Sequence, residues 1–110
     1  MIKVGEHITL DIIGTKKEYD ASFFESLVHK IAGKAKVTVL NIAKYKFEPQ
    51  GFTLVALLAE SHISFHTYPE KGIISFDFYT CGTVAPSIAL EVIKKEIEHK
   101  RIIKKELNRD

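Results

Sequence analysis

Hydrophobic and polar residues alternate along the first clear segment of the chain, HITLDII at residues 7–13. Isoleucine and leucine fall on one face of this segment, whereas histidine, threonine and aspartate fall on the other. Side chains of a β-strand point to its two faces in turn, so this period of two predicts a strand with one polar face.

The pattern changes to a helical period after residue 20. Hydrophobic side chains recur three and four residues apart, which places them on one stripe of a helix: Phe24, Leu27, Val28 and Ile31. Asp20 is a suitable N-cap, and we expect the helix to end near Gly33 because glycine tolerates the left-handed conformation that closes many helices. We expect this helix to cover the sheet.

Four further segments are rich in β-branched and aromatic residues, which favour strands. Along the chain they are 37–45, 52–59, 62–68 and 73–79, with the turn sequences EPQG at 48–51 and PEKG at 69–72. The second of these segments, 52–59, is apolar on both faces, as an interior strand is. We therefore expect two hairpins, one in each pair of segments.

Past Gly82 the helical period returns, with a stripe made of Ala89, Leu90, Ile93 and Ile97. The closing segment RIIKKEL, residues 101–107, predicts a short edge strand whose lysines discourage unwanted pairing. Together the patterns predict one α+β domain over residues 1–110. It is a two-layer sandwich, with a mainly antiparallel sheet, two helices on one face and polar residues on the other.

Composition narrows the function classes. The 110 residues are 45% hydrophobic and 27% charged, which is typical of one globular domain. The net charge is only +2, and the C-terminal lysines alternate with glutamates, so we expect no nucleic-acid partner. The longest apolar run, 54–59, is far shorter than the roughly 20 residues of a membrane span. We expect no membrane partner and a cytoplasmic location.

The candidate metal ligands are few. Cys81 is the single cysteine, which excludes an internal disulfide and a multi-cysteine zinc site. His62 and His66 would converge on one ion if they lay on a helix. The β-rich context instead places them about 13 Å apart along a strand, whereas two ligands of one zinc ion each lie about 2 Å from it. We expect no metal.

AESHISFHTYPE, residues 59–70, concentrates nucleophiles and proton carriers after an apolar run. A serine hydrolase would combine Ser61 and His66 with Asp11 or Asp77, but the G-x-S-x-G signature is missing. The structural interpretation is that the histidines are hydrogen-bonded sheet residues and Cys81 a small buried side chain. Taken singly, each residue favours this interpretation, but the cluster as a whole does not.

The segment FEPQGFTLVALLAESHISFHTYPEKGIISFDFYTCG, residues 47–82, resembles the small bacterial and archaeal form of S-adenosylmethionine decarboxylase. That family consists of pyruvoyl-dependent enzymes that cleave themselves. GEHITLDIIG near the start, the intervening AGKAKVTVL and the overall length also agree. The last thirty or so residues match by pattern alone.

The resemblance implies self-processing. The Ser61 hydroxyl would attack the carbonyl of Glu60, convert the amide to an ester, and cut the chain by elimination. The products would be residues 1–60 and residues 61–110, the second carrying a pyruvoyl group derived from Ser61. His66 matches the residue that acts in processing as a proton acceptor. Thr53 stands where the family usually has a serine that supports the intermediate.

For catalysis, the resemblance implies that the pyruvoyl ketone forms a Schiff base with the substrate amine and accepts the negative charge left by decarboxylation. Neither a metal nor pyridoxal phosphate would be needed. Cys81 matches the proton donor, Phe47 an aromatic that stacks on adenine, and Glu70 a carboxylate that accepts the ribose hydroxyls. Tyr68 replaces the more usual tryptophan beside the pocket.

Alternatives remain open at this stage. Pyruvoyl-dependent arginine and ornithine decarboxylases of the same fold would share the processing residues, and an uncleaved, noncatalytic binding domain is a further possibility. The family implies a homodimer of cleaved protomers and a product that feeds spermidine synthesis. Ser61 and His66 are five residues apart, so an unbroken strand points them to opposite faces. We therefore expect the backbone to turn or bulge near the cleavage point.

Overall fold

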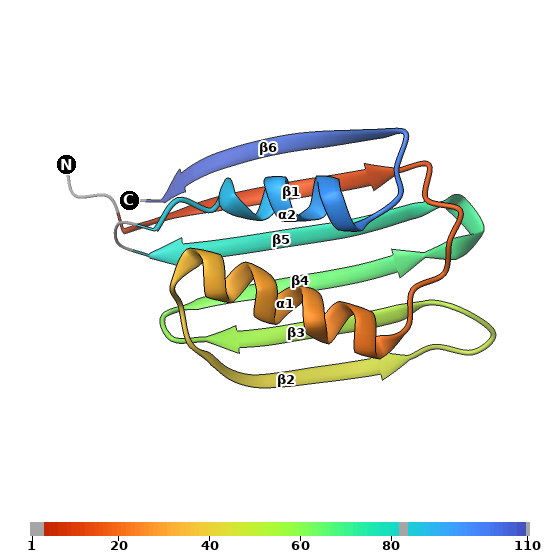
Figure 1. Cartoon of the computed structure of the whole chain (residues 1–110), viewed down its shortest axis with the longest axis horizontal. Coiled ribbons are helices and arrows are strands. Elements are labelled where there is room, and N and C mark those ends of the chain that lie inside the picture. The colour runs from red at the N-terminus through yellow and green to blue at the C-terminus, as the bar shows by residue number, and fades with distance from the viewer. Residues whose placement is uncertain (1–3, 82–83, 110) are drawn as a thin grey trace.

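The computed structural model describes residues 4–81 and 84–109. These residues form six strands, two α-helices and one short 3-10 turn, in the order β1 (Gly5–Ile13), α1 (Ala21–Ala35), β2 (Val39–Lys46), β3 (Phe52–Leu58), β4 (Ser61–Tyr68), η1 (Pro69–Lys71), β5 (Ile73–Cys81), α2 (Ile88–Glu96) and β6 (Arg101–Arg109). One antiparallel sheet has the order β2-β3-β4-β5-β1-β6. Both helices lie on the same face (Figure 1). The predicted two-layer α+β sandwich is confirmed.

Both predicted hairpins are present, and a third turn joins them. β2 pairs with β3, and β4 pairs with β5. Leu58 at the end of β3 pairs with Ser61 at the start of β4, so only Ala59 and Glu60 form the connection. The four strands therefore make a continuous meander, and β4 begins at the proposed cleavage point.

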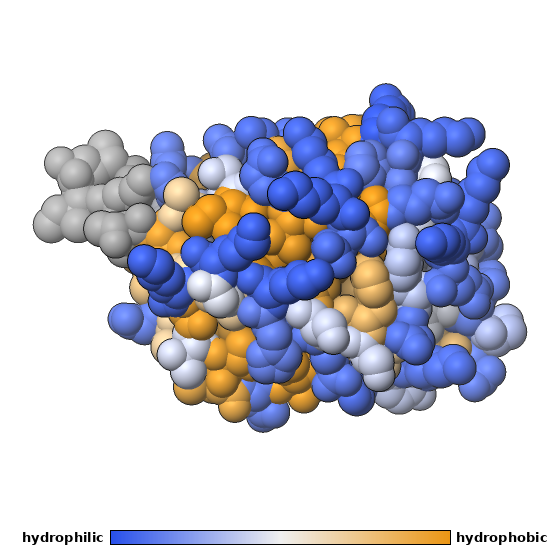
Figure 2. Space-filling model, viewed as in Figure 1, coloured by the Kyte–Doolittle hydropathy of each residue, from blue (hydrophilic) through white to orange (hydrophobic). Residues whose placement is uncertain are grey.

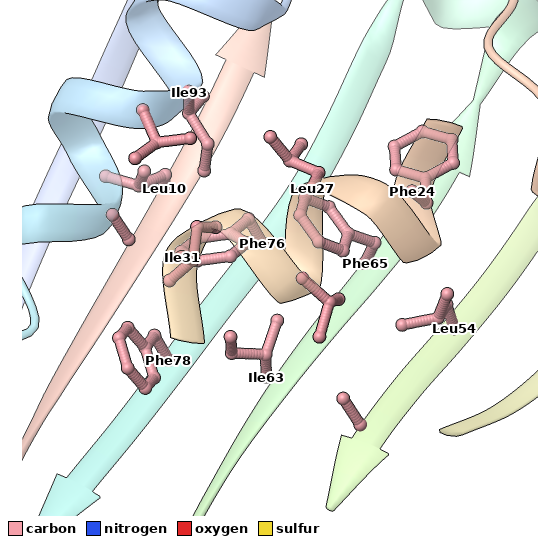
Figure 3. Close-up of a cluster of buried hydrophobic side chains, with 14 of the residues drawn as sticks. Leu10, Phe24, Leu27, Ile31, Leu54, Ile63, Phe65, Phe76, Phe78 and Ile93 are labelled. Atoms are coloured by element: carbon pink, nitrogen blue, oxygen red, sulfur yellow. The ribbon is translucent and has the colours of Figure 1, made fainter. Parts of the chain in front are cut away.

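The hydrophobic core fills the space between the helices and one sheet face. Ile63 and Phe65 of β4 are fully buried and alternate with partly exposed neighbours, as the period of two predicts. The Phe65 ring lies 5.1 Å from the ring of Phe24 on α1 and 4.9 Å from the ring of Phe76 on β5, measured between centroids. Figure 3 shows side chains of both helices meeting those of the strands in this layer.

The start of α1 was predicted more accurately than its end. Asp20 caps α1 as expected, and its side chain accepts a hydrogen bond of 2.9 Å from the backbone N–H of Phe23. The helix does not end at Gly33 but continues to Ala35, and Lys36 adopts the left-handed conformation at φ 59°. Ala35 is buried in the core, so packing carries the helix past an exposed glycine.

In α2 the predicted stripe is nearly right. Ala89 and Ile93 are buried, and Ile97 is buried just after the helix ends. Val92 takes the place predicted for Leu90, which is only half buried. Gly82, taken as the point where the period changes, lies outside the described residues. Among the described residues, neither helix is long and apolar enough to cross a membrane.

The sheet face without helices is here called the open face. It was predicted to be polar, but it also carries exposed hydrophobic residues. Val55 and Leu57 on β3 are 42% and 54% exposed, and Leu107 on β6 is 58% exposed. β6 forms one edge of the sheet as expected, although at Arg101–Arg109 it is longer than predicted. Figure 2 shows the other side of the molecule, where the helices lie. Hydrophilic side chains are spread over this surface, with hydrophobic residues between them.

Replacing Phe65 with alanine should lower the free energy of unfolding by about 3–5 kcal/mol, because the large cavity it leaves lies between two other aromatic rings. Leu40→Ala is the matched control, since Leu40 is exposed and its loss should change stability by less than about 0.5 kcal/mol. Urea denaturation followed by circular dichroism measures both. Equal stability losses in the two variants would contradict this description of the core.

Candidate active site

The β3–β4 turn holds an unusual backbone conformation. Glu60 has φ 61°, in the left-handed region that side chains with a Cβ rarely adopt. The next residue, Ser61, is only 8% exposed and lies on the helix side of β4, in step with Ile63 and Phe65. The bond between Glu60 and Ser61 therefore joins a strained turn to a buried hydroxyl group.

Cys81 lies at the same end of the sheet. His62 pairs with Tyr79, so the register continued by two residues brings Cys81 level with Glu60. Cys81 is half buried and is a free thiol. On the neighbouring strand β1, Cys81 pairs with Gly5. A Cβ atom at position 5 would lie 2.5 Å from the Thr80 carbonyl oxygen, so only glycine fits there. We call Glu60, Ser61 and Cys81 the Ser61 group.

His66 lies on the open face near the opposite end of β4. It pairs directly with Thr53 on β3, and the Thr53 Oγ1 and His66 Nδ1 atoms are 3.0 Å apart, a hydrogen-bond distance. A hydroxyl at position 53 therefore contacts the imidazole predicted to act with it.

The residues predicted to bind substrate lie at this same end. Phe47 is exposed just after β2, its ring 4.8 Å from that of Tyr45 between centroids. Glu70 lies in η1, and its Oε2 atom accepts a hydrogen bond of 3.0 Å from the Gln50 side chain. Tyr68 ends β4 and is also exposed. We call Phe47, Thr53, His66, Tyr68 and Glu70 the His66 group.

One protomer does not bring the two groups together. β4 pairs in continuous register with both neighbours, so Ser61 and His66 are separated by five extended residues, or about 16 Å. Their side chains also point to opposite faces. The expected turn is present but precedes Ser61, and it leaves this opposition unchanged. Proton transfer between Ser61 and His66 of the same protomer is therefore excluded in this conformation.

A second polar cluster, which the sequence analysis did not find, lies near the middle of the open face. The Nε2 atoms of His7 and His62 are 2.6 and 3.2 Å from the Oδ2 atom of Asp77. The Ser64 hydroxyl donates a hydrogen bond to the other carboxylate oxygen, Oδ1. The Tyr79 ring packs against both imidazoles, with centroids 5.8 Å away. We call these five residues the Asp77 cluster.

The contacts of Asp77 set its protonation state. Burial by itself raises the pKa of Asp77, but the hydrogen bonds from Ser64 and His7 and the nearby His62 outweigh burial. The pKa of this carboxyl group therefore lies below its usual value, and the group is ionised at neutral pH.

These contacts contradict the serine hydrolase alternative. Asp77 contacts His7 and His62, whereas His66 contacts Thr53. Asp11 is separated from His66 by the whole of β5, since Ser75 pairs with both of them. His62 and His66 lie on one strand and contact different partners, so they do not converge on one ion, as the strand pattern predicted.

The alternation of the three strands contained part of the signal for the Asp77 cluster. His7, His62 and Asp77 each fall on the polar face of their own segment. What the sequence did not give is the register: His7, Tyr79 and His62 form one row across β1, β5 and β4, and Asp77 lies in the next row on that face.

A cavity at the start of α1 does not coincide with the candidate site. It has a volume of about 640 Å³ and lies between the start of α1 and the loop before β3. Its lining includes Phe24, Phe52 and Gln50 but neither His66 nor Phe47. The predicted functional side chains other than Ser61 instead gather on the open face and at its ends.

Comparison with known proteins agrees with the resemblance. The family model for S-adenosylmethionine decarboxylase matches residues 6–110. An S-adenosylmethionine decarboxylase proenzyme of Symbiobacterium thermophilum is 41% identical over 93 residues, covering 82% of this chain and 70% of that protein. One of Brevibacillus brevis is 38% identical, covering 96% and 81%. The crystal structure of the adenosylmethionine decarboxylase from Aquifex aeolicus superposes with a TM-score of 0.86 at 34% identity, covering 97% and 91%. The chain belongs to the S-adenosylmethionine decarboxylase family.

Proposed function

We propose that this protein is a pyruvoyl-dependent S-adenosylmethionine decarboxylase, made as one chain and cut between Glu60 and Ser61. Its product would be S-adenosylmethioninamine, the aminopropyl donor for spermidine synthesis in the cytoplasm. Family membership supports the reaction class. The observation that carries the self-cleavage is the left-handed, non-glycine backbone of Glu60 at the bond to be cut.

The cleavage uses atoms of the chain alone. The Ser61 Oγ atom attacks the carbonyl carbon of Glu60, and the amide becomes an ester as the nitrogen is released. A base then removes the α-proton of residue 61, and elimination frees the Glu60 carboxylate and leaves dehydroalanine. Water then adds in place of the nitrogen of residue 61. The nitrogen leaves as ammonia, and the pyruvoyl group remains at the start of the second piece. The pieces are residues 1–60 and 61–110.

Backbone strain favours this bond over its neighbours. A non-glycine residue in the left-handed region costs roughly 1–2 kcal/mol. The strain falls on Glu60, whose carbonyl carbon is the point of attack, and cutting the chain after it removes the turn that imposes the conformation. A reacting group held next to its target also saves the entropy of bringing the two together.

The pyruvoyl group supplies an electron sink for decarboxylation, which is why the chain needs neither pyridoxal phosphate nor a metal for this step. The thiol of Cys81 lies at the same end of the sheet and would deliver a proton to the substrate carbon. A positioned general acid contributes about 10²–10⁴-fold to such a step.

The separation of the two groups supports a homodimer with shared sites. In an isologous dimer a surface meets the same surface of its partner, so one end of a sheet can lie against the other end of the partner's sheet. The end of the sheet that carries the Ser61 group of one protomer would then lie beside the His66 group of the other, with Cys81 on the open face and Ser61 at the edge of that face. The exposed Val55, Leu57 and Leu107 make the open face suitable for such burial.

Within the shared site the His66 group would recognise the substrate. Phe47 offers an exposed ring for the adenine base, and Glu70 offers two acceptor oxygens for the ribose diol. Thr53 would hold His66 in the orientation needed to take the α-proton during processing. Arginine or ornithine would leave Phe47 and Glu70 without a nucleoside to bind, which is why S-adenosylmethionine is the preferred substrate.

Purified wild-type protein should give two fragments on denaturing gels and by mass spectrometry, split between Glu60 and Ser61. Ser61→Ala should stay in one piece and release no carbon dioxide, because the attacking hydroxyl is gone. Ser26→Ala, on the exposed side of α1, is the control and should be cut like the wild type. An intact wild-type chain would refute self-cleavage and leave a noncatalytic binding domain.

Shared sites predict complementation between two inactive variants. Ser61→Ala and His66→Ala should each be inactive alone, whereas coexpression should restore about a quarter of wild-type decarboxylation. Half of the randomly formed dimers are then mixed, and each mixed dimer has one complete site. Size-exclusion chromatography confirms that both variants remain dimers. Two variants that stay inactive together would rule out sites shared between protomers.

Glu70→Gln should raise the KM for S-adenosylmethionine while self-cleavage proceeds as before. Losing a charged hydrogen-bond acceptor costs about 1.5–3 kcal/mol, which corresponds to roughly 10–100-fold. Release of labelled carbon dioxide from carboxyl-labelled S-adenosylmethionine, arginine and ornithine measures the decarboxylation rate of the variant and of the wild type. Glu18→Gln is the control and should have the KM of the wild type. Faster turnover of arginine or ornithine by the wild type would overturn the substrate assignment.

A further inference from the structure

We propose that His7, His62 and Asp77 bind one divalent transition-metal ion of the Zn²⁺ type. Each residue offers one ligand atom, and the three atoms lie within 4.8 Å of one another. Two imidazole nitrogens and one carboxylate oxygen are a donor set that suits Zn²⁺ and related ions. The proposed decarboxylation does not use this site.

The spacing of the donor atoms fits the ion. Ligands at about 2.0–2.2 Å around a tetrahedral Zn²⁺ lie roughly 3.3 Å from one another. The Asp77 Oδ2 atom is 2.6 Å from the His7 Nε2 atom and 3.2 Å from the His62 Nε2 atom. Side-chain movements of less than about 1 Å would therefore open the triangle enough for an ion to replace the two hydrogen bonds.

The ligands come from three adjacent strands of the sheet. β4, β5 and β1 lie side by side in its interior, which gives the site a rigid base (Figure 1). His7 and His62 pair with Tyr79 from its two sides, and its ring packs against both imidazoles and limits their rotation. Asp77 lies two residues from Tyr79, so both imidazoles reach it diagonally.

The surroundings of Asp77 resemble those of a metal ligand. The Ser64 hydroxyl donates to Oδ1 and so orients the carboxylate while Oδ2 stays directed at the histidines. Such outer partners fix ligand geometry in metal sites. In the single protomer the His7 and Asp77 side chains are 22% exposed and His62 is 43% exposed, so an ion can reach the three ligands before the proposed dimer buries the open face.

Charge at the site works in both directions. The carboxylate oxygen of Asp77 that faces both histidines would attract a cation. Arg109 lies over the Tyr79 ring, 5.6 Å from its centroid, and its positive charge opposes a bound cation. We therefore expect binding that tightens when Arg109 is replaced by Gln.

The site would also link the two pieces of the cleaved enzyme, an extension that depends on the proposed self-cleavage. His7 belongs to residues 1–60, whereas His62 and Asp77 belong to residues 61–110. One ion bound by all three would join the pieces next to the cut. The Ser61→Ala variant keeps all three ligands in an uncut chain, so metal binding and cleavage are measured separately.

Metal-stripped wild-type protein and Ser61→Ala should each bind one Zn²⁺ per chain in competition with a chromophoric chelator. His7→Gln, His62→Gln and Asp77→Asn should each weaken Zn²⁺ binding by at least about 100-fold. Loss of a residue that only hydrogen-bonds a metal ligand already costs about 10–100-fold in affinity, and loss of the ligand itself should cost more. Ser64→Ala should weaken binding by about 10–100-fold. Co²⁺ bound at the site should give a visible absorption band that these ligand variants lose.

The controls are His29→Gln, an exposed histidine on α1, and Cys81→Ser, which removes the thiol as a competing ligand. Both should bind Zn²⁺ like the wild type. Circular dichroism and size exclusion establish that every variant is folded. Less than one ion per chain, unchanged affinity in the ligand variants, or binding lost with Cys81 would overturn the proposal and leave a hydrogen-bond cluster only.

Discussion

The rest of the structure depends on one constraint: both helices cover the same face of an antiparallel sheet. Side chains alternate between the two faces of every strand, so the interior strands β3, β4, β5 and β1 each give about half of their residues to the core and the rest to the open face. On the covered side the result is a continuous hydrophobic layer. On the open side it is a surface of histidines, acids, hydroxyls and exposed aliphatic side chains. Most of the predicted functional side chains therefore lie on the face that the core does not use, and Ser61, on the helix side at the start of β4, is the exception.

The antiparallel pairing then distributes the functional residues over that surface. Residues 53 and 66 become partners because β3 and β4 run in opposite directions, although thirteen positions separate them in the chain. Ser61 and His66 are close in the sequence and far apart in space, because an extended strand separates them by about 16 Å. A fold that keeps its strands regular cannot close this distance within one protomer. The proposed assembly of two protomers would bring the two groups together without bending any strand.

The connection between β3 and β4 combines two opposing demands. A tight two-residue turn keeps both strands in register and the core intact. The same turn holds Glu60 in a left-handed conformation that a side chain disfavours. The stability of the sheet thus maintains local strain at one peptide bond. Nearby, the Asp77 cluster holds β1, β4 and β5 together through hydrogen bonds between strands, and it does so across the proposed cut.

The sequence by itself determined the elements, their order and the core stripe of α1, because periodicity is a property of neighbouring positions. The residues proposed for the active site also come from one local motif. It missed the end of α1, where burial of Ala35 outweighs the preference for Gly33, and it predicted an open face that was too polar. The two hairpins were predicted from the sequence, but only the tertiary structure decided how β1 and β6 join them and in what register the strands pair. Register brought His7 to Asp77 and kept Ser61 from His66, because contacts between distant segments depend on how strands align, which local patterns do not encode.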